Sequence, residues 1–401
     1  MGIASCVVCG ATTAEPVLAV DRVPIHPFCP PADLGIAPGF GTLRIVSCSA
    51  CGHLYNAAFE ADRIDELYAA AVLTNTPVSE SMIKNLEATA DYILSRSPAN
   101  PTVVDVGGGT GVLARTLARR AAEVHLVEPS RALTREDFAG SGVTLHRCNF
   151  PSPALADRQF DVIVSRQVVE HIPEPLAFLQ ALRAQLAPRG VAYLEIPSAE
   201  YIEQTRSVVD FHYPHVHYYR RDEFQTLLAR AGFEVIEVVD VKEGHDRGFL
   251  LRATEPTRLP YSGRSAAGFL RGELAERIRA GRQRLDALAG TIALYGANAY
   301  SQALFGLFPG KCYTAMFDDT PMYEGQRAYG PGIDVVIRRP SIDAIGNVSA
   351  VVITAYLHDL GIAQRLRQLG FHGQVFTVRS DDLAGRDGRP AALFDVDMMA
   401  T

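Results

Sequence analysis

Apolar and polar positions alternate along the middle of the chain in a pattern typical of buried strands followed by amphipathic helices. Short apolar runs of the kind that form buried parallel strands occur at residues 102–106, 123–129, 143–148, 160–165 and 191–197. Helix-like segments separate several of these runs, and two further strand-like runs, FEVIEVVDV and GFLLRAT, follow them. This alternation predicts a doubly wound α/β sheet with a β-rich end.

A second block with the same plan lies nearer the C-terminus. One amphipathic helix is predicted over residues 264–289, and strand-like runs follow at 292–297, 312–319, 350–356 and 374–378. We therefore expect a second Rossmann-like α/β domain behind a linker helix. Residues after 380 are expected to be irregular, residues 23–41 to be mostly loop because of their Pro and Gly content, and residues 62–96 to be helical.

The composition sets broad limits on function. The chain has 401 residues, which is enough for two or three domains, and its 48% apolar and 21% charged residues are ordinary for a globular protein. A net charge of −7 argues against nucleic-acid binding, and no apolar run is long enough to cross a membrane. Because the N-terminus lacks a secretory signal pattern, we expect a cytoplasmic protein, either a monomer or a homodimer.

The spacing of four cysteines near the N-terminus predicts a metal site. Two Cys-x-x-Cys-Gly knuckles have their cysteines at Cys6, Cys9, Cys48 and Cys51. In a reducing compartment this spacing indicates zinc more readily than disulfides. Four thiolates close a tetrahedral shell, so the predicted zinc is structural, and Cys29 and His26 remain alternative ligands between the two pairs.

A glycine-rich turn, DVGGGTG at residues 105–111, follows the first central strand and precedes a helix. Its glycines permit a tight turn and the close approach of a ligand. Asp105 beside the turn would repel a pyrophosphate but suits a ligand that carries an ammonium group. Glu128 follows the second strand and can accept both hydroxyls of a ribose. A sulfonium nucleoside with an amino-acid tail fits this turn better than a nicotinamide dinucleotide.

Together with VVEHIPEP at 168–175 and LRAQLAPRGVAYLEIP at 182–197, these motifs resemble the class I S-adenosylmethionine-dependent methyltransferases over roughly residues 100–255. The resemblance implies that S-adenosylmethionine is the cofactor. It places the methionine moiety at Asp105, Gly107, Gly109 and Gly111, the ribose at Glu128, the adenine near Asn149 and Phe150, and the sulfonium near Arg166, Gln167 and Val168.

The order of the three modules, with YGANA, FDDTPMYEG, GPGIDV and AVVITAYLHD in the last one, is similar to that of the nucleotide-sugar C-methyltransferases of deoxysugar and natural-product biosynthesis. This resemblance implies a nucleotide-linked keto sugar as the acceptor and carbon as the methylated atom. An O- or N-methyltransferase of another small metabolite remains the alternative, and the acidic balance disfavours a zinc-containing RNA methyltransferase.

The resemblance also suggests a division of the chain. We expect a zinc-binding module at 1–60, a helical connector or lid at 61–98, an S-adenosylmethionine-binding methyltransferase domain at 99–258, a linker helix at 259–290 and a C-terminal Rossmann-like domain at 291–401. Because the C-terminal domain lacks a full glycine fingerprint, we expect it to form a wall of the acceptor site and not to bind a dinucleotide, with Asp318, Asp319 and Tyr323 as candidates.

The stretch FHYPHVHYY at residues 211–219 has three readings. Its histidines could bind a metal, pack at a partly exposed surface, or take a proton from a carbon next to a carbonyl, since a free imidazole titrates near neutrality. We favour the last reading, because the stretch follows the fifth central strand, at the mouth of the cleft. The candidate catalytic residues are His215 as the base, Tyr218, His217 and Tyr68 as enolate partners, and His171 as a second base.

Overall fold

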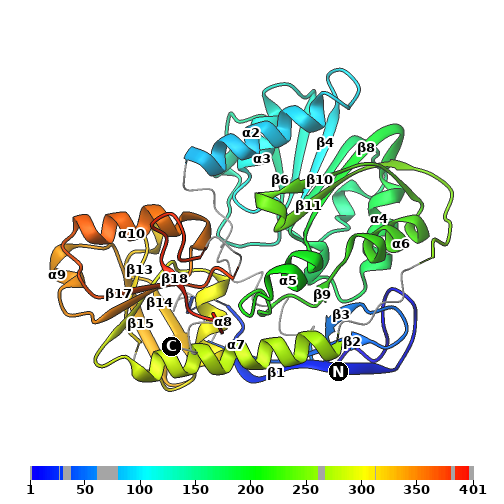
Figure 1. Cartoon of the computed structure of the whole chain (residues 1–401). Helices are drawn as coiled ribbons and strands as arrows, with labels where there is room; N and C mark the ends of the chain where they lie inside the picture. Colours follow the sequence, from blue (N-terminus) through cyan, green and yellow to red (C-terminus); the bar gives the residue numbers. More distant parts are fainter. Residues whose placement is uncertain are drawn as a thin grey trace.

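The computed structural model describes residues 2–26, 28–29, 38–60, 80–260, 267–311, 313–380 and 384–396. Within these ranges the chain forms one four-stranded sheet and two seven-stranded sheets. Figure 1 shows the central sheet above the blue N-terminal strands, with the C-terminal sheet to one side. The predicted connector at 61–98 is represented only by helix α2 and the residues after it, and Tyr68 lies outside the described residues.

The central sheet has the order β10-β11-β8-β7-β4-β5-β6. Its strands are β4 (Thr102–Val106), β5 (Glu123–Val127), β6 (Val143–His146), β7 (Phe160–Arg166), β8 (Leu186–Pro197), β10 (Phe233–Val241) and β11 (Asp246–Ala253). The strands from β8 to β6 are parallel, and β11 joins them antiparallel at the other end. The predicted strand–helix alternation and the β-rich end are therefore confirmed.

Helices cover both faces of this sheet, which explains why its strands are apolar at almost every position. The helices are α2 (Glu80–Leu94), α3 (Val112–Ala118), α4 (Pro175–Ala184) and α6 (Arg221–Ala231). Val103 packs in the core that includes residues of α2 and α3, whereas the next residue, Val104, packs in the core that includes α4 and α6. Neighbouring side chains of β4 thus enter opposite cores, and the carboxyl end of the strand is left at the cavity described below.

The C-terminal sheet has the order β14-β15-β13-β12-β16-β17-β18. Its strands are β12 (Ile292–Tyr295), β13 (Tyr313–Phe317), β14 (Arg327–Gly330), β15 (Ile333–Arg338), β16 (Ala350–Ile353), β17 (Gln374–Thr377) and β18 (Ala391–Ala392). Its helices are α8 (Ala299–Leu307), α9 (Ile342–Ile345) and α10 (Asp359–Gln368), and the linker helix is α7 (Ala267–Ala287). The tail after residue 380 was predicted to be irregular, but it adds the short strand β18.

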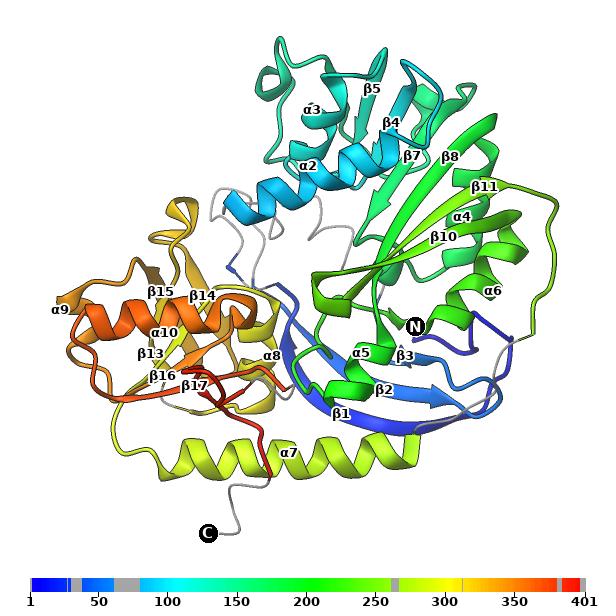
Figure 2. The same cartoon turned by 45° about the horizontal axis from the view of Figure 1, so that its top comes forward.

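The N-terminal sheet was not predicted from the sequence. It consists of β1 (Ala14–Pro24), β2 (Phe40–Cys48), β3 (Leu54–Asn56) and β9 (His217–Tyr218), in the order β1-β2-β3-β9. Two register shifts relative to β2 interrupt the alternation of buried positions along β1, whereas β2 itself alternates regularly. Strand β9 belongs to the 211–219 stretch, and its pairing with β3 joins the cysteine-bearing module to the central domain (Figure 1). Figure 2 shows β1 of the same sheet running alongside the linker helix α7.

Among the described residues, no helix combines the length and the apolarity that crossing a lipid bilayer requires.

Candidate active site

A cavity of about 1080 Å³ extends from the carboxyl ends of the central strands to the first turn of α8. The glycine loop after β4 forms one end, the 211–219 stretch lies along it, and Asn298 and Tyr300 of the C-terminal domain contribute to the other end. This is the edge at which open α/β sheets hold their ligands. The volume is large enough for a cofactor together with a small second molecule.

Hydrogen bonds to the residues around β5 fix the conformation of the glycine loop. The Gly107 amide donates to the Val127 carbonyl at 2.8 Å, and the Gly109 amide donates to Oε2 of Glu128 at 3.0 Å. The other Glu128 oxygen accepts from the Ser130 amide at 3.2 Å, so the carboxylate is fixed in place and keeps further lone pairs for hydroxyl donors. Burial raises the pKa of Glu128 above its ordinary value.

Asp105 lies under this loop and is only 1% exposed. Its Oδ2 atom accepts no hydrogen bond from any residue that the structure describes. Burial raises the pKa of Asp105 to about 7, against a smaller opposing effect from Arg166. A buried, unpaired carboxyl group at a cavity wall suits a cationic ligand group, as expected for the ammonium of a methionine moiety.

Most of the residues predicted to hold the cofactor line the cavity. They are Asp105, Gly107, Gly109, Glu128, Asn149, Phe150, Arg166, Gln167 and Val168. Gly111 does not line it; this glycine has a φ of +72° at the start of α3, and an added Cβ would come within 2.5 Å of Phe138. Its role here is therefore in the turn and its packing. Arg166 forms a two-point ion pair with Glu195, with N–O distances of 3.0 and 2.7 Å.

Three imidazoles meet in the middle of the cavity. The rings of His212 and His215 have centroids 4.1 Å apart, and those of His171 and His215 are 4.7 Å apart. Burial lowers the pKa of His171 and of His212 to about 4, and it lowers the pKa of His215 well below its ordinary value. All three rings are therefore neutral at pH 7, and burial makes each of them a weaker base than a free imidazole.

The other residues of this stretch have different positions. Tyr218 lines the cavity, and its hydroxyl donates to the His212 carbonyl at 3.4 Å. His217 does not line it; its Nδ1 lies 3.2 Å from Nε2 of His53, and its Nε2 lies 3.4 Å from the Pro173 carbonyl. The metal reading based on His212, His215 and His217 is therefore not supported, because His217 points to another part of the molecule.

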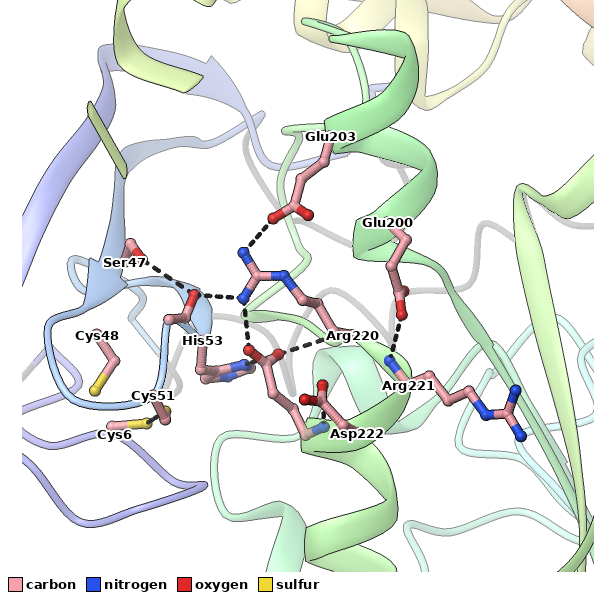
Figure 3. Close-up of polar contacts among 12 residues, drawn as sticks. Cys6, Ser47, Cys48, Cys51, His53, Glu200, Glu203, Arg220, Arg221 and Asp222 are labelled. Atoms are coloured by element: carbon pink, nitrogen blue, oxygen red, sulfur yellow. Dashed lines mark hydrogen bonds and ion pairs between the residues drawn. The ribbon is translucent and has the colours of Figure 1, made fainter. Parts of the chain in front are cut away.

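A buried polar network anchors this stretch to the N-terminal module (Figure 3). His53 is buried, and its Nδ1 lies 3.2 Å from Oε2 of Glu223. Arg220 donates to the Gly52 carbonyl at 3.0 Å and to Oε1 of Glu223 at 2.8 Å, and it also forms an ion pair with Glu203. The network holds residues at both ends of β9 against the N-terminal module. Contacts with the cysteine-bearing module therefore help to position the 211–219 stretch and its histidines.

The four knuckle cysteines converge, with all their sulfur atoms within 4.8 Å of one another. The Sγ atoms of Cys6 and Cys51 are 3.5 Å apart, and those of Cys9 and Cys48 are also 3.5 Å apart. A tetrahedral zinc with Zn–S bonds of about 2.3 Å needs sulfurs about 3.8 Å apart, so the donor set fits zinc. Cys29 is not part of this group.

The far end of the cavity holds a charged group that the sequence analysis missed. His245 lies with Nδ1 2.6 Å from Asp246 and Nε2 2.9 Å from both Asp210 and the Tyr300 hydroxyl. Burial alone would lower its pKa, but the two carboxylates overcome burial and raise it to about 10. Lys242 is also paired with Asp246, at 2.5 Å. The adjacent His245 and Asp246 were the available signal in the sequence.

The C-terminal wall differs from the expectation. Asn298, Ala299, Tyr300 and Gln302 line the cavity, whereas Asp318, Asp319 and Tyr323 do not. Asp318 instead accepts a hydrogen bond from the Ala297 amide at 2.7 Å, and Asp319 accepts one from the Tyr295 hydroxyl at 2.8 Å. Both carboxylates therefore serve the internal structure of the C-terminal domain.

Comparison with known proteins agrees with this geometry. A family model described as "Methyltransferase domain" matches residues 78–238. A "Ubiquinone biosynthesis O-methyltransferase" of Ralstonia nicotianae is 36% identical over 107 residues, which cover 25% of this chain and 45% of that protein. A protein of the same name from Pseudomonas paraeruginosa is 29% identical over 161 residues, covering 35% of this chain and 68% of that protein. The chain thus spans less than half of the first relative's length.

Among solved structures, an S-adenosylmethionine-dependent methyltransferase from Clostridium acetobutylicum superposes with a TM-score of 0.38 at 14% identity. The superposition covers 48% of this chain and 98% of that chain. The family match at residues 78–238 and the cavity together identify the central domain as a methyltransferase domain.

Proposed function

We propose that this protein, whose central domain is a class I S-adenosylmethionine-dependent methyltransferase domain, transfers a methyl group to a small molecule held in its histidine-lined cavity. One observation carries the proposal: the glycine loop at 105–109 and the imidazoles of His171, His212 and His215 line the same cavity. The cofactor and a proton acceptor are therefore available to one acceptor molecule.

The residues present fit the cofactor. Asp105 offers an unpaired, buried carboxyl oxygen for the ammonium group, Glu128 offers lone pairs for the ribose hydroxyls, and Gly109 has open space where a side chain would stand. When bound, S-adenosylmethionine supplies an electrophilic methyl group on a positively charged sulfur. The chain holds the cofactor by these contacts and shields the reacting groups from water within the cavity.

We propose that the acceptor atom is a carbon next to a carbonyl group. A neutral imidazole of the cavity removes the proton from that carbon, and the C–H electron pair forms an enolate. Tyr218 lines the cavity, and its hydroxyl would donate to the enolate oxygen in place of the His212 carbonyl, its 3.4 Å partner in the ligand-free structure. The enolate carbon then forms the new C–C bond as the carbon–sulfur bond breaks, and the proton passes from the imidazole to solvent.

For the acceptor itself we propose a nucleotide-linked keto sugar, as the three-module resemblance implies. The cavity continues beyond the glycine loop as far as Asn298 and Tyr300, which leaves space for a second ligand beside the cofactor. Arg166 and Lys242 line the cavity and are cations that a diphosphate could contact, but each is already paired with a carboxylate, Glu195 or Asp246. A diphosphate would have to compete with those ion pairs.

The second candidate is O-methylation of another small metabolite, which the names of the curated relatives favour. Solvent exchange separates the two candidates. The experiment is done in ²H₂O with the demethylated form of the cofactor bound. A C-methyltransferase that forms an enolate should then exchange the hydrogen on the carbon next to the carbonyl for deuterium. Methyl transfer to oxygen with no deuterium at carbon would replace the first proposal with the second.

A substitution tests the cavity histidines directly. His215→Ala should lower turnover by about 10²–10⁴-fold, the contribution typical of one positioned proton-transfer group. The Kd for S-adenosylmethionine should stay within about twofold, since the cofactor loop is untouched. His372→Ala, which changes an exposed histidine of the C-terminal domain, is the matched control. Full turnover in the His215 variant would remove this residue from the mechanism.

We also propose that the four-cysteine cluster binds one structural zinc ion. The sulfur spacing and the lack of an open coordination position support this assignment. Elemental analysis should find this zinc in the wild-type protein and not in Cys48→Ser, whose free energy of unfolding should also fall, because metal binding is coupled to folding. Cys29→Ser is the control and should keep the zinc. Undiminished zinc in the Cys48 variant would contradict the four-thiolate site.

A further inference from the structure

Glu170, His171 and His215 bring one carboxylate and two imidazoles together beside the cavity. Their potential ligand atoms all lie within 4.8 Å of one another. Glu170 and His171 come from the 3-10 helix η4 (Val169–His171), and His215 comes from the 211–219 stretch. The Val216 amide donates to the Glu170 carbonyl at 2.8 Å, so the two segments are fastened together at this point.

The side chain of Glu170 has no evident role in the fold. The residue is 1% exposed, and neither carboxylate oxygen accepts a hydrogen bond within the described part of the chain. The closest ring nitrogen, Nε2 of His171, is 3.7 Å from Oε1. A buried carboxyl group without hydrogen bonds is costly, and such groups call for an ion, a water molecule or a functional role as their explanation.

His171 is oriented as a metal ligand would be. Its Nδ1 lies 3.4 Å from the Pro214 carbonyl, which can only accept, so this contact favours the tautomer with the proton on Nδ1. The lone pair is then on Nε2, the nitrogen on the side of Glu170. A backbone carbonyl that fixes the tautomer in this way is the usual outer-shell partner of a metal-bound histidine.

We propose that Glu170, His171 and His215 bind a divalent transition-metal ion with coordination positions open to the cavity. Two imidazoles and one carboxylate are a donor set for Zn²⁺ or Fe²⁺, whereas Mg²⁺ and Ca²⁺ prefer oxygen ligands alone. His171 and His215 line the cavity, so an oxygen atom of the acceptor could complete the coordination shell.

This inference rests on the proposed function, because the ion would act as a Lewis acid on the carbonyl oxygen of the acceptor. It would stabilise the negative charge that develops on that oxygen when the neighbouring carbon loses its proton. The lone pairs of His171 and His215 would be shared with the ion. His212, whose ring lies against His215, would then be the imidazole left to take the proton.

The test is the metal content of the full-length protein after removal of metal and dialysis against excess Zn²⁺. The wild-type protein should hold two ions per chain, one at the four cysteines and one at the new site. Glu170→Gln, which keeps the size of the side chain and removes its charge, should hold one ion and lose about 100-fold in turnover. Glu174→Gln makes the same change at an exposed position four residues away and should hold two ions with full turnover.

One zinc per chain in the saturated wild-type protein would overturn the site without recourse to any variant. Wild-type turnover in Glu170→Gln would overturn it as well, even if carbonyl acceptors are methylated, and would leave the proposed function standing. Two ions per chain in a protein that methylates no carbonyl acceptor would have the opposite meaning: the metal site would stand, and the proposed reaction would fall.

Discussion

The two seven-stranded sheets share a plan, yet their equivalent loops serve different purposes. In each domain a carboxylate directly after the second strand, Glu128 or Asp318, accepts a hydrogen bond from an amide of the loop that follows the first strand. Each carboxylate also accepts an amide two residues further along, that of Ser130 or Thr320. The two domains therefore share one arrangement of loop amides around a carboxylate.

The difference lies in what fills each loop. Helix α8 has Asn298 at its N-cap, and the Asn298 side chain accepts from the amides of Tyr300 and Ser301. Helix α3 has Gly111 at the same position and no side-chain cap. The central loop also has the unpaired Asp105 oxygen beneath it. The central loop thus leaves a buried carboxyl oxygen unpaired, whereas the loop of the C-terminal domain is closed by its own side-chain cap and forms part of the cavity wall.

The two loops should differ most in how strongly cofactor affinity depends on their equivalent carboxylates, Glu128 and Asp318. Glu128→Gln should weaken S-adenosylmethionine binding by about 10- to 100-fold, because hydrogen bonds to a charged acceptor are worth about 1.5–3 kcal/mol. Asp318→Asn should change that Kd by less than about twofold, since its carboxylate serves the C-terminal domain alone. Calorimetric titration of both variants measures the contrast, and equal losses of affinity would show that the two loops are not functionally distinct.

A smaller effect should appear in the pH dependence of cofactor binding. Burial raises the pKa of Asp105 to about 7 in the ligand-free protein, and an ammonium group would favour the ionised form. Binding below pH 7 must then release a proton, so affinity should fall as the pH decreases, by up to about tenfold per unit, and should level off above 7.

Asp105→Asn is the control for this prediction. The variant should bind about tenfold more weakly than wild type at pH 7.5 and should lose the slope between pH 5.5 and 7. A slope that survives in the variant would mean that another group is responsible for the pH dependence.

The cofactor end of the cavity could be predicted from the sequence because its chemistry is local. Asp105 lies near the carboxyl end of a strand that the apolar pattern identifies, and the glycines and Glu128 directly follow such strands. Parallel strands bring these carboxyl ends to one edge of the sheet. The four cysteines are a similar case, since two short knuckles carry their own spacing signal. In both cases the residues that act together are marked by the sequence immediately around them.

The acceptor end could not be predicted in the same way. Glu170 and His215 are brought together by the backbone hydrogen bond from the Val216 amide to the Glu170 carbonyl, and no periodicity reveals that contact between distant segments. The placement of His217 depends on strand β9, a two-residue strand that pairs with the N-terminal module. A strand of two residues that pairs with a distant part of the chain leaves no pattern in the local sequence. His217 was therefore predicted to lie with the cavity histidines.

The smallest predicted effect concerns a tyrosine in each sheet that donates to a carboxylate. Tyr295→Phe removes the 2.8 Å hydrogen bond to Asp319 and should lower the free energy of unfolding by about 1 kcal/mol. The loss is modest because Asp319 keeps its ion pair with Arg365, at 2.6 Å on a partly exposed surface. Cofactor affinity should be unchanged, since Tyr295 does not line the cavity.

Tyr193→Phe makes the same change in the central domain, where the hydroxyl donates to Glu195 at 3.0 Å. Tyr193 lines the cavity, and Glu195 holds Arg166 at its wall, so this variant should lose a similar amount of stability and also several-fold in S-adenosylmethionine affinity. Denaturant unfolding and calorimetric titration of the two variants separate the effects. If Tyr295→Phe weakened cofactor binding as much as Tyr193→Phe does, the two domains would be energetically coupled, and the C-terminal sheet would be more than a wall.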